Sequence, residues 1–180
     1  MTSSGPTRPL FNEASPKLAL RQAWPSDFGR IHGWLGNPEV QRWWGNGASA
    51  EAEIRLAFAS EASLCRLIQL NGMAIGYAQA VEFGLTGAPI PHPIGPGTWD
   101  CDLFIGSQPH RGLGLGQSAL DLLVGEVFST TLAIACAIMV PVRHERAVRA
   151  YERVGFRWVS IAEDQIHGAS WVMIRDREPT

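Results

Sequence analysis

The chain contains the stretch Arg111-Gly112-Leu113-Gly114-Leu115-Gly116, between a predicted strand over 99–105 and a predicted helix over 114–128. Glycines allow backbone N–H groups to turn inward and approach a pyrophosphate closely, and the helix start adds a partial positive charge. The Rossmann pattern G-x-G-x-x-G would need glycine where Gln117 stands, and a Walker A loop would need a lysine. The pattern that remains, Arg-x-x-Gly-x-Gly, predicts a pyrophosphate-binding loop.

The composition narrows the class of protein. The chain has 180 residues, 46% of them apolar, which suits one globular domain and excludes a disordered chain. The formal net charge of −2 argues against a nucleic-acid binder of basic composition. Lys17 is the single lysine among 15 basic residues, which excludes Schiff-base chemistry on a core lysine.

Targeting and redox signals are weak in this sequence. No apolar run reaches the roughly 18 residues needed to span a bilayer, and residues 1–16 form a loose tail without an apolar signal core. The widely spaced Cys65, Cys101 and Cys136 predict neither a disulfide framework nor a metal motif. We therefore expect a cytoplasmic protein that uses no metal and acts without a membrane partner.

Hydrophobic periodicity and turn signals predict one mixed α/β domain over residues 17–180. Ser26 and Asn37 are the predicted N-caps of the first two helices, and Ser49 is the predicted start of the third. Asn71-Gly72 predicts a tight hairpin turn. The expected strands span 17–22, 66–70, 73–83, 99–105, 132–140, 157–162 and 169–175. The expected helices span 28–35, 38–45, 49–62, 114–128 and 145–154. Segment 84–98, rich in proline and glycine, is expected to be a long loop.

Charge is distributed unevenly along the chain. Segment 67–110 has no lysine or arginine, and its charged residues are Glu82, Asp100 and Asp102. Segment 143–157, in contrast, contains five arginines. A cationic acceptor and a polyanionic cofactor would each meet an opposite field. The alternative is that strands and turns are poor in lysine and arginine for structural reasons alone.

Asp100 and Asp102 fall on one face of the predicted strand 99–105, because side chains alternate along a strand. A carboxylate there can bind an ammonium group, orient it and accept its proton, which frees the nitrogen lone pair. The alternative is that one or both carboxylates point to solvent at a sheet edge. Cys101 faces the other way, which argues against an acyl-enzyme on its thiol and favours direct transfer.

A second motif lies downstream of the glycine loop. Ala147, Tyr151 and Gly155-Phe156 fit the pattern A-x-x-x-Y-x-x-x-G-F. Together with the loop and the order of elements, this pattern resembles the GNAT superfamily of acyl-CoA N-acyltransferases over about residues 17–175. The resemblance implies the α/β GNAT fold, a mixed central sheet of six to seven strands flanked by helices. It also implies acetyl-CoA as the co-substrate.

Further segments are similar to aminoglycoside 6′-N-acetyltransferases, namely Pro38-Glu39-Val40, Trp43-Trp44-Gly45, Ile75-Gly76-Tyr77-Ala78-Gln79, Asp102 and 146–152. That similarity implies acetyl transfer to the 6′-amine of an aminoglycoside, an antibiotic-resistance activity, by a monomer or homodimer. Siderophore-type acyltransferases share parts of the pattern. A siderophore precursor, a polyamine or a protein amine therefore stays open as the acceptor, as does a non-catalytic acyl-CoA-binding module.

The resemblance also implies roles for individual residues. Asp102 is expected to bind and deprotonate the acceptor ammonium, and Tyr151 to protonate the departing thiolate. The alternative for Tyr151 is a core tyrosine whose hydroxyl bonds to the backbone. N–H groups near Phe104 and Ile105 are expected to polarise the thioester carbonyl. Other expected cofactor contacts are Arg111, Gly112, Leu113, Gly114, Leu115, Gly116 and His144, the last standing where many relatives have asparagine. Expected acceptor contacts are Trp44, Tyr77, Gln79, Glu82 and Asp100.

Overall fold

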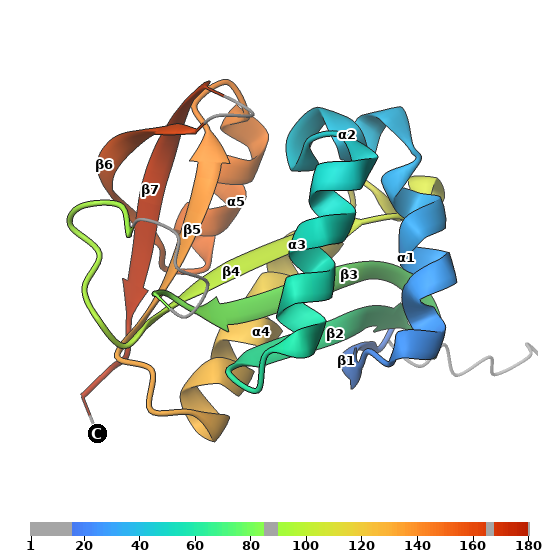
Figure 1. Ribbon diagram of the computed structural model, residues 1–180, viewed down its shortest axis with the longest axis horizontal. Coiled ribbons are helices and arrows are strands. Elements are labelled where there is room, and N and C mark those ends of the chain that lie inside the picture. The colour runs from blue at the N-terminus through green and yellow to red at the C-terminus, as the bar shows by residue number, and fades with distance from the viewer. Residues whose placement is uncertain (1–15, 85–89, 165–167, 180) are drawn as a thin grey trace, which may run out of the picture.

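The computed structural model describes residues 16–84, 90–164 and 168–179, which form a seven-stranded sheet in the order β1-β2-β3-β4-β5-β7-β6 (Figure 1). The strands are β1 (Leu18–Gln22), β2 (Ser63–Leu70), β3 (Met73–Glu82), β4 (Thr98–Ile105), β5 (Ala135–Pro141), β6 (Arg157–Asp164) and β7 (Gly168–Asp176). The helices are α1 (Phe28–Leu35), α2 (Pro38–Trp44), α3 (Gly47–Ala59), α4 (Leu115–Thr130) and α5 (Glu145–Arg153). The predicted fold class is therefore confirmed, while the expected tail over 1–16 lies, except for Pro16, outside the described residues.

Several predicted boundaries are wrong: β2 begins at Ser63 rather than at 66, and α3 ends at Ala59 rather than at 62. Helix α3 begins at Gly47 rather than at Ser49, because the Asn46 side chain caps it by accepting the Ser49 N–H at 3.0 Å. Ser26 lies inside a short 3-10 turn (Pro25–Asp27), where the Asp27 carboxylate accepts the Trp24 N–H at 2.8 Å.

Another wrong boundary is the start of the fifth strand, placed at Leu132. The Thr131 hydroxyl accepts the Ala133 N–H at 3.0 Å, and the resulting turn leaves Leu132 97% exposed. Strand β5 therefore begins only at Ala135. An apolar run alone cannot reveal such a turn, because the deciding bond comes from a hydroxyl.

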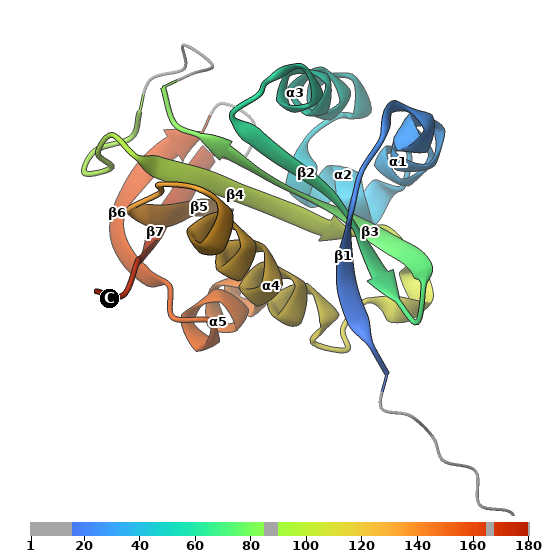
Figure 2. The same cartoon turned by 90° about the horizontal axis from the view of Figure 1, so that it is seen from below.

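Helices cover both faces of the sheet (Figure 2). The core under α4 and α5 contains Leu103, Leu120, Val124 and Ile138 among its buried residues. On the other face, α1, α2 and α3 pack over Leu67, Tyr77 and Phe104. The two faces are therefore independently filled, and alternate residues of β4 serve one core or the other.

Strands β4 and β5 are parallel and pair over only three residues of each strand. The pairs are Thr98 with Ala135, Trp99 with Cys136, and Asp100 with Ala137. Beyond Asp100 the strands part, while β4 stays paired with β3 as far as Ile105 and β5 stays paired with β7 as far as Pro141. The sheet is therefore open in its middle, and this gap positions the site described below.

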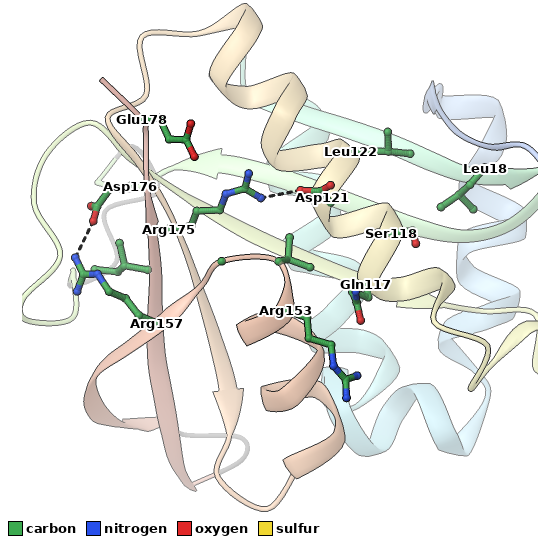
Figure 3. Close-up of a pocket in the computed structure, with 13 residues that line it drawn as sticks. Leu18, Gln117, Ser118, Asp121, Leu122, Arg153, Arg157, Arg175, Asp176 and Glu178 are labelled. Atoms are coloured by element: carbon green, nitrogen blue, oxygen red, sulfur yellow. Dashed lines mark hydrogen bonds and ion pairs between the residues drawn. The ribbon is translucent and has the colours of Figure 1, made fainter. Parts of the chain in front are cut away.

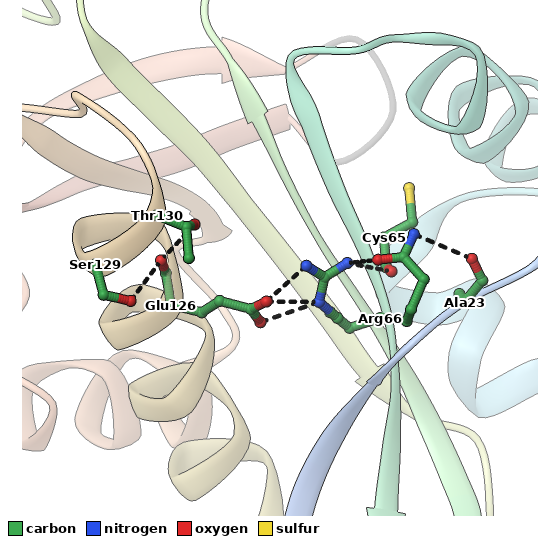
Figure 4. Close-up of polar contacts among 7 residues, drawn as sticks. Ala23, Cys65, Arg66, Glu126, Ser129 and Thr130 are labelled. Carbon is green, nitrogen blue, oxygen red and sulfur yellow. Dashed lines mark hydrogen bonds and ion pairs between the residues drawn. The ribbon is translucent and has the colours of Figure 1, made fainter.

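A buried ion pair joins α4 to the sheet (Figure 4). The Arg66 side chain, on β2, donates to the Glu126 carboxylate at 2.6–3.0 Å and to the Cys65 carbonyl at 2.9 Å. Its third partner is the Gln22 side chain on β1. Arg66 is 8% exposed and the Glu126 side chain 28%, so loss of the guanidinium would leave a half-buried carboxylate without its cation.

Replacement of Arg66 by alanine tests this contact. Leaving a half-buried polar group unsatisfied costs about 1–3 kcal/mol, so we expect a loss of about 2 kcal/mol in the free energy of unfolding. Urea denaturation measures it. The matched control is Arg149→Ala, which breaks the exposed pair with Glu145 and should change stability by no more than about 0.5 kcal/mol. Equal effects of the two substitutions would contradict the assignment.

Candidate active site

The gap between β4 and β5 opens into a cleft of about 420 Å³. Its walls are Asp102, Leu103, Phe104 and Ile105 on one strand and Met139, Val140 and Pro141 on the other. Helix α2 contributes Glu39, Val40, Trp43 and Trp44, and the glycine loop with α4 contributes Arg111, Gly112, Gly114, Gly116 and Gln117. The remaining lining residues are His144, Arg146, Ala147, Ala150, Tyr151 and Arg153. The cleft thus unites both sequence motifs.

The glycine loop has the backbone geometry that its sequence predicts. Gly112 and Gly114 have φ angles of +82° and +79°, a region that favours glycine. Gly114 is the N-cap of α4, so the unpaired N–H groups of the first helical turn lie at the cleft. The Arg146 guanidinium lies so close to Gly112 that a Cβ there would be 2.7 Å from its Nη2. The N–H groups at the start of α4 and the Arg146 guanidinium therefore lie together beside the glycine loop, an arrangement that suits the binding of an anion.

Arg111 lies at the cleft but clamps the backbone. Its Nε donates to the Ile105 carbonyl at 2.8 Å and its Nη2 to the Gly106 carbonyl at 2.7 Å. Its Nη1 reaches the side chain of Asn37, the N-cap of α2, at 3.3 Å. The motif leucines are placed differently from the glycines: Leu113 is 66% exposed and Leu115 packs against the core.

The backbone of β4 facing the gap is almost fully engaged. The Leu103 N–H donates to the Asp102 carboxylate at 3.0 Å, and the Leu103 carbonyl accepts from the Trp44 indole at 3.2 Å. N–H directions alternate along a strand, so the Ile105 N–H also faces the gap. The Phe104 carbonyl instead faces β3, where a Cβ on Gly76 would lie 2.3 Å from it. Of the two expected donors, Ile105 is the one directed into the cleft.

Asp102 and Tyr151 both line the cleft, from β4 and α5 respectively. Tyr151 is partly buried against the core under α4, with its ring 6.5 Å from that of Phe156. Burial, and secondarily the negative charge of Asp102, raises the pKa of the Tyr151 phenol. The phenol is therefore protonated at neutral pH, as a proton donor must be.

Tyr77 and Gln79 do not line the cleft. They are 0% and 4% exposed and belong to the core under α1, α2 and α3. The Tyr77 hydroxyl donates to Gln79 Oε1 at 3.1 Å, and Gln79 Nε2 donates to the Glu53 carboxylate on α3 at 2.7 Å. This buried relay fixes a carboxylate on the same face as Asp102, which pairs with Gln79 across the strands.

Asp100 lies two positions before Asp102 on the same face of β4, outside the cleft lining. Burial, with a smaller contribution from the Glu53 carboxylate, raises the pKa of Asp100 to about 8. Glu82 lies at the outer end of β3, opposite Trp99, and also outside the lining. The expected acidic residues thus extend from the cleft at Asp102 outward along the sheet.

His144 and Trp43 meet at the mouth of the cleft. Their rings stack with centroids 3.7 Å apart and an interplanar angle of 15°. Burial, followed by the charges of Arg146 and Arg42, lowers the pKa of His144 to about 4, so the imidazole is neutral at pH 7. His144 is the N-cap of α5, but its side chain makes no capping bond. The sequence did not predict this ring contact, because Trp43 and His144 are far apart along the chain.

A comparison with family models decides the family. The model of the acetyltransferase (GNAT) domain matches residues 24–163, most of the chain. The chain belongs to the GNAT acetyltransferase family. No curated protein matches it.

Several solved structures share this GNAT fold. AAC(6′)-Ib, an aminoglycoside acetyltransferase crystallised with coenzyme A, is 24% identical and superposes with a TM-score of 0.76 over 89% of this chain and 95% of that chain. An aminoglycoside N(6′)-acetyltransferase from Legionella pneumophila is 19% identical and has a TM-score of 0.69, over 90% of this chain and 93% of that chain. A chimera of the Vibrio cholerae spermidine N-acetyltransferase SpeG with hSSAT is 15% identical and has a TM-score of 0.69, over 88% of this chain and 95% of that chain. At these identities the likeness establishes the fold.

A second, larger depression of about 830 Å³ lies on the GNAT domain beside α4, α5 and β7 (Figure 3). Its arginines Arg175 and Arg157 pair with Asp121 and Asp176, each at 2.7 Å. Gln117 and Arg153 line both this depression and the cleft, so the two are neighbours.

The described residues contain no cluster of three or more potential metal ligands. No helix in the described part of the chain is long and apolar enough to cross a membrane.

The raised pKa of Asp100 predicts a pH effect on stability. An unfolded aspartate has a pKa of about 3.9, whereas burial raises that of Asp100 to about 8 in the folded chain. Between these values the folded chain holds a proton that the unfolded chain has lost, so this group lowers stability as pH rises.

We therefore expect Asp100→Asn to gain stability relative to the wild type as pH rises from about 4 to about 8. Urea denaturation across this range measures the difference. Glu152→Gln, on the exposed side of α5, is the control and should show a constant difference. A constant difference for Asp100→Asn as well would refute the buried, protonated carboxyl.

Proposed function

We propose that this GNAT enzyme transfers an acetyl group from acetyl-CoA to the 6′-amine of an aminoglycoside. The observation that carries the proposal is the cleft between β4 and β5, which is lined both by the glycine loop with Arg146 and by Asp102. An anionic cofactor and a cationic amine would therefore each meet an opposite charge in the same cleft. The three buried, unlinked cysteines are compatible with the reducing cytoplasm where we place this reaction.

The cofactor end offers three kinds of donor. The backbone N–H groups of Gly112, Gly114 and the first turn of α4 suit the pyrophosphate, with Arg146 beside them. The pantetheine arm would pass between the walls of β4 and β5. Its thioester carbonyl would then accept a hydrogen bond from the Ile105 N–H, which stabilises the negative charge that develops on that oxygen during attack.

Asp102 and Tyr151 supply the two proton transfers. Asp102 accepts a proton from the acceptor ammonium, directly or through water, and the freed amine attacks the thioester carbon. A C–N bond forms and the C–S bond breaks. Tyr151 protonates the leaving thiolate, and the second proton lost by the nitrogen as the amide forms restores the Tyr151 phenol. Amide and thiol are the products, so no acyl-enzyme is needed, and the buried Cys101 takes no part.

The acidic stretch beyond Asp102 supports a cationic acceptor. The relay from Tyr77 through Gln79 fixes the Glu53 carboxylate on the same face. Asp100 lies beside it, and this carboxyl, with a pKa of about 8, would lose its proton on facing a bound ammonium group. Aminoglycosides have several ammonium groups on rigid rings, and a polyamine has them on a flexible chain. A polyamine is the second candidate acceptor, because a spermidine N-acetyltransferase chimera shares the fold.

A CoA-release assay with acetyl-CoA tests the acceptor. We expect turnover of kanamycin and tobramycin, which have a 6′-amine, and none of analogues with a 6′-hydroxyl group. Spermidine and a lysine peptide complete the panel. Comparable turnover of the 6′-hydroxyl analogues would move the reaction to another amine, and turnover of spermidine alone would favour the polyamine. No CoA release with any amine of the panel would favour a non-catalytic binding module.

Asp102→Asn tests the base. The substitution keeps the shape of the side chain but removes its charge and basicity, and loss of a general base typically costs about 10²–10⁴-fold in rate. We expect that fall in kcat/KM for the acceptor, with calorimetric affinity for CoA nearly unchanged because the pyrophosphate loop is a separate element. Asp100→Asn, outside the cleft lining, should cost less. Full activity of Asp102→Asn would exclude Asp102 as the base.

A further inference from the structure

We propose that the stacked rings of Trp43 and His144 form a roof over the acyl end of the cleft and select acetyl over longer acyl groups. The proposal rests on the placement of acetyl-CoA argued above but does not depend on which amine is the acceptor. Trp43 lies on α2, and His144 lies at the junction of β5 and α5. Their contact therefore joins the two halves of the molecule that the parting of β4 and β5 has separated.

The direction of the cofactor arm follows from the two faces of the sheet. The glycine loop leads into α4, which covers one face of the sheet. Cys101 and Leu103 of β4 point to that face and pack in the core under α4. Asp102 alternates with these residues and shares its face with Phe104, which packs under α1, α2 and α3. An arm that starts at the glycine loop and brings its thioester to Asp102 must pass through the gap. Its acyl group then emerges on the side of α2, where Trp43 lies.

Contacts at the end of α2 hold the Trp43 side of the roof. The Trp44 indole donates to the Leu103 carbonyl, which ties the end of α2 to the β4 wall. The guanidinium groups of Arg42 and Arg143 lie 5.0 and 5.8 Å from the Trp43 ring centroid. The imidazole is neutral at pH 7, so stacking adds no further positive charge among these arginines. Such a pair of flat, anchored rings resists displacement by an extra methylene group.

An asparagine at position 144 could not replace this roof. An amide has no ring to lay against the indole, so the distance across the mouth would no longer be fixed by a face-to-face contact. Relatives with asparagine there would control their acyl site by other means. The selectivity we infer is therefore a property of this chain's own Trp43 and His144.

Calorimetric titration with acetyl-CoA and butyryl-CoA tests the roof without any acceptor. A misfitting methylene group costs about 10–200-fold, so we expect the wild type to bind acetyl-CoA at least about tenfold more tightly than butyryl-CoA. Trp43→Ala and His144→Asn should each reduce this ratio to near one while acetyl-CoA still binds. His144→Phe keeps a stacking ring and should keep the preference. Trp158→Ala removes a 62% exposed ring on β6 and is the matched control.

Each outcome decides between the two proposals. An equal affinity of the wild type for both ligands overturns the roof, and so does an unchanged ratio in both Trp43→Ala and His144→Asn when circular dichroism shows them folded. If His144→Phe loses the preference as fully as His144→Asn, the ring stack is not the selector. Failure of the wild type to bind either acyl-CoA refutes the proposed function and the roof together, whereas an unchanged ratio refutes the roof alone.

Discussion

The parting of β4 and β5 after Asp100 is the constraint on which the site depends. A strand that leaves its neighbour exposes N–H and C=O groups, and buried groups of this kind need partners. The chain supplies them from side chains: Asp102 for the Leu103 N–H, Trp44 for the Leu103 carbonyl, and Arg111 for the Ile105 carbonyl. These three residues, which the sequence predicted to lie in the site, thus also satisfy backbone hydrogen bonds of β4 where no neighbouring strand does so.

This double use limits how each residue can act. The Arg111 guanidinium donates to two backbone carbonyls at the end of β4 and to the side chain that caps α2. Its main effect is therefore to hold β4, α2 and the glycine loop together. Arg146, which lies against Gly112, is the better placed cation for a phosphate. Asp102, with one oxygen on the Leu103 N–H, is oriented by the strand on which it lies.

Local sequence signals predicted much of the fold and less of the site. The Asn71-Gly72 hairpin and the Asn37 cap are fixed by contacts within a few residues, and both are present. The cap of α3 and the start of β5 were missed because each depends on which of two nearby polar side chains takes a backbone N–H. The glycine loop and the Tyr151 helix were found from spacing, since each is a single continuous element.

Contacts across the fold were beyond the reach of the sequence. The Gln79–Glu53 bond links residues 26 positions apart, and no periodicity marks it. Tyr77 and Gln79 were expected to touch the acceptor because of the motif around them. Their burial instead gives them an indirect part, in which they fix Glu53 from within the core.

Position 144 shows how an N-cap residue without a capping bond can be tolerated. A capping side chain is worth about 0.5–2 kcal/mol, and His144 forgoes it, since its ring makes no capping bond. An aromatic pair contributes about 0.5–1.5 kcal/mol beyond its buried area, and the stack on Trp43 supplies that instead. These two contributions to stability are of similar size, so stability alone favours neither a capping side chain nor the stacked histidine at this position. Local folding energy therefore leaves position 144 open to selection by what the cleft must bind.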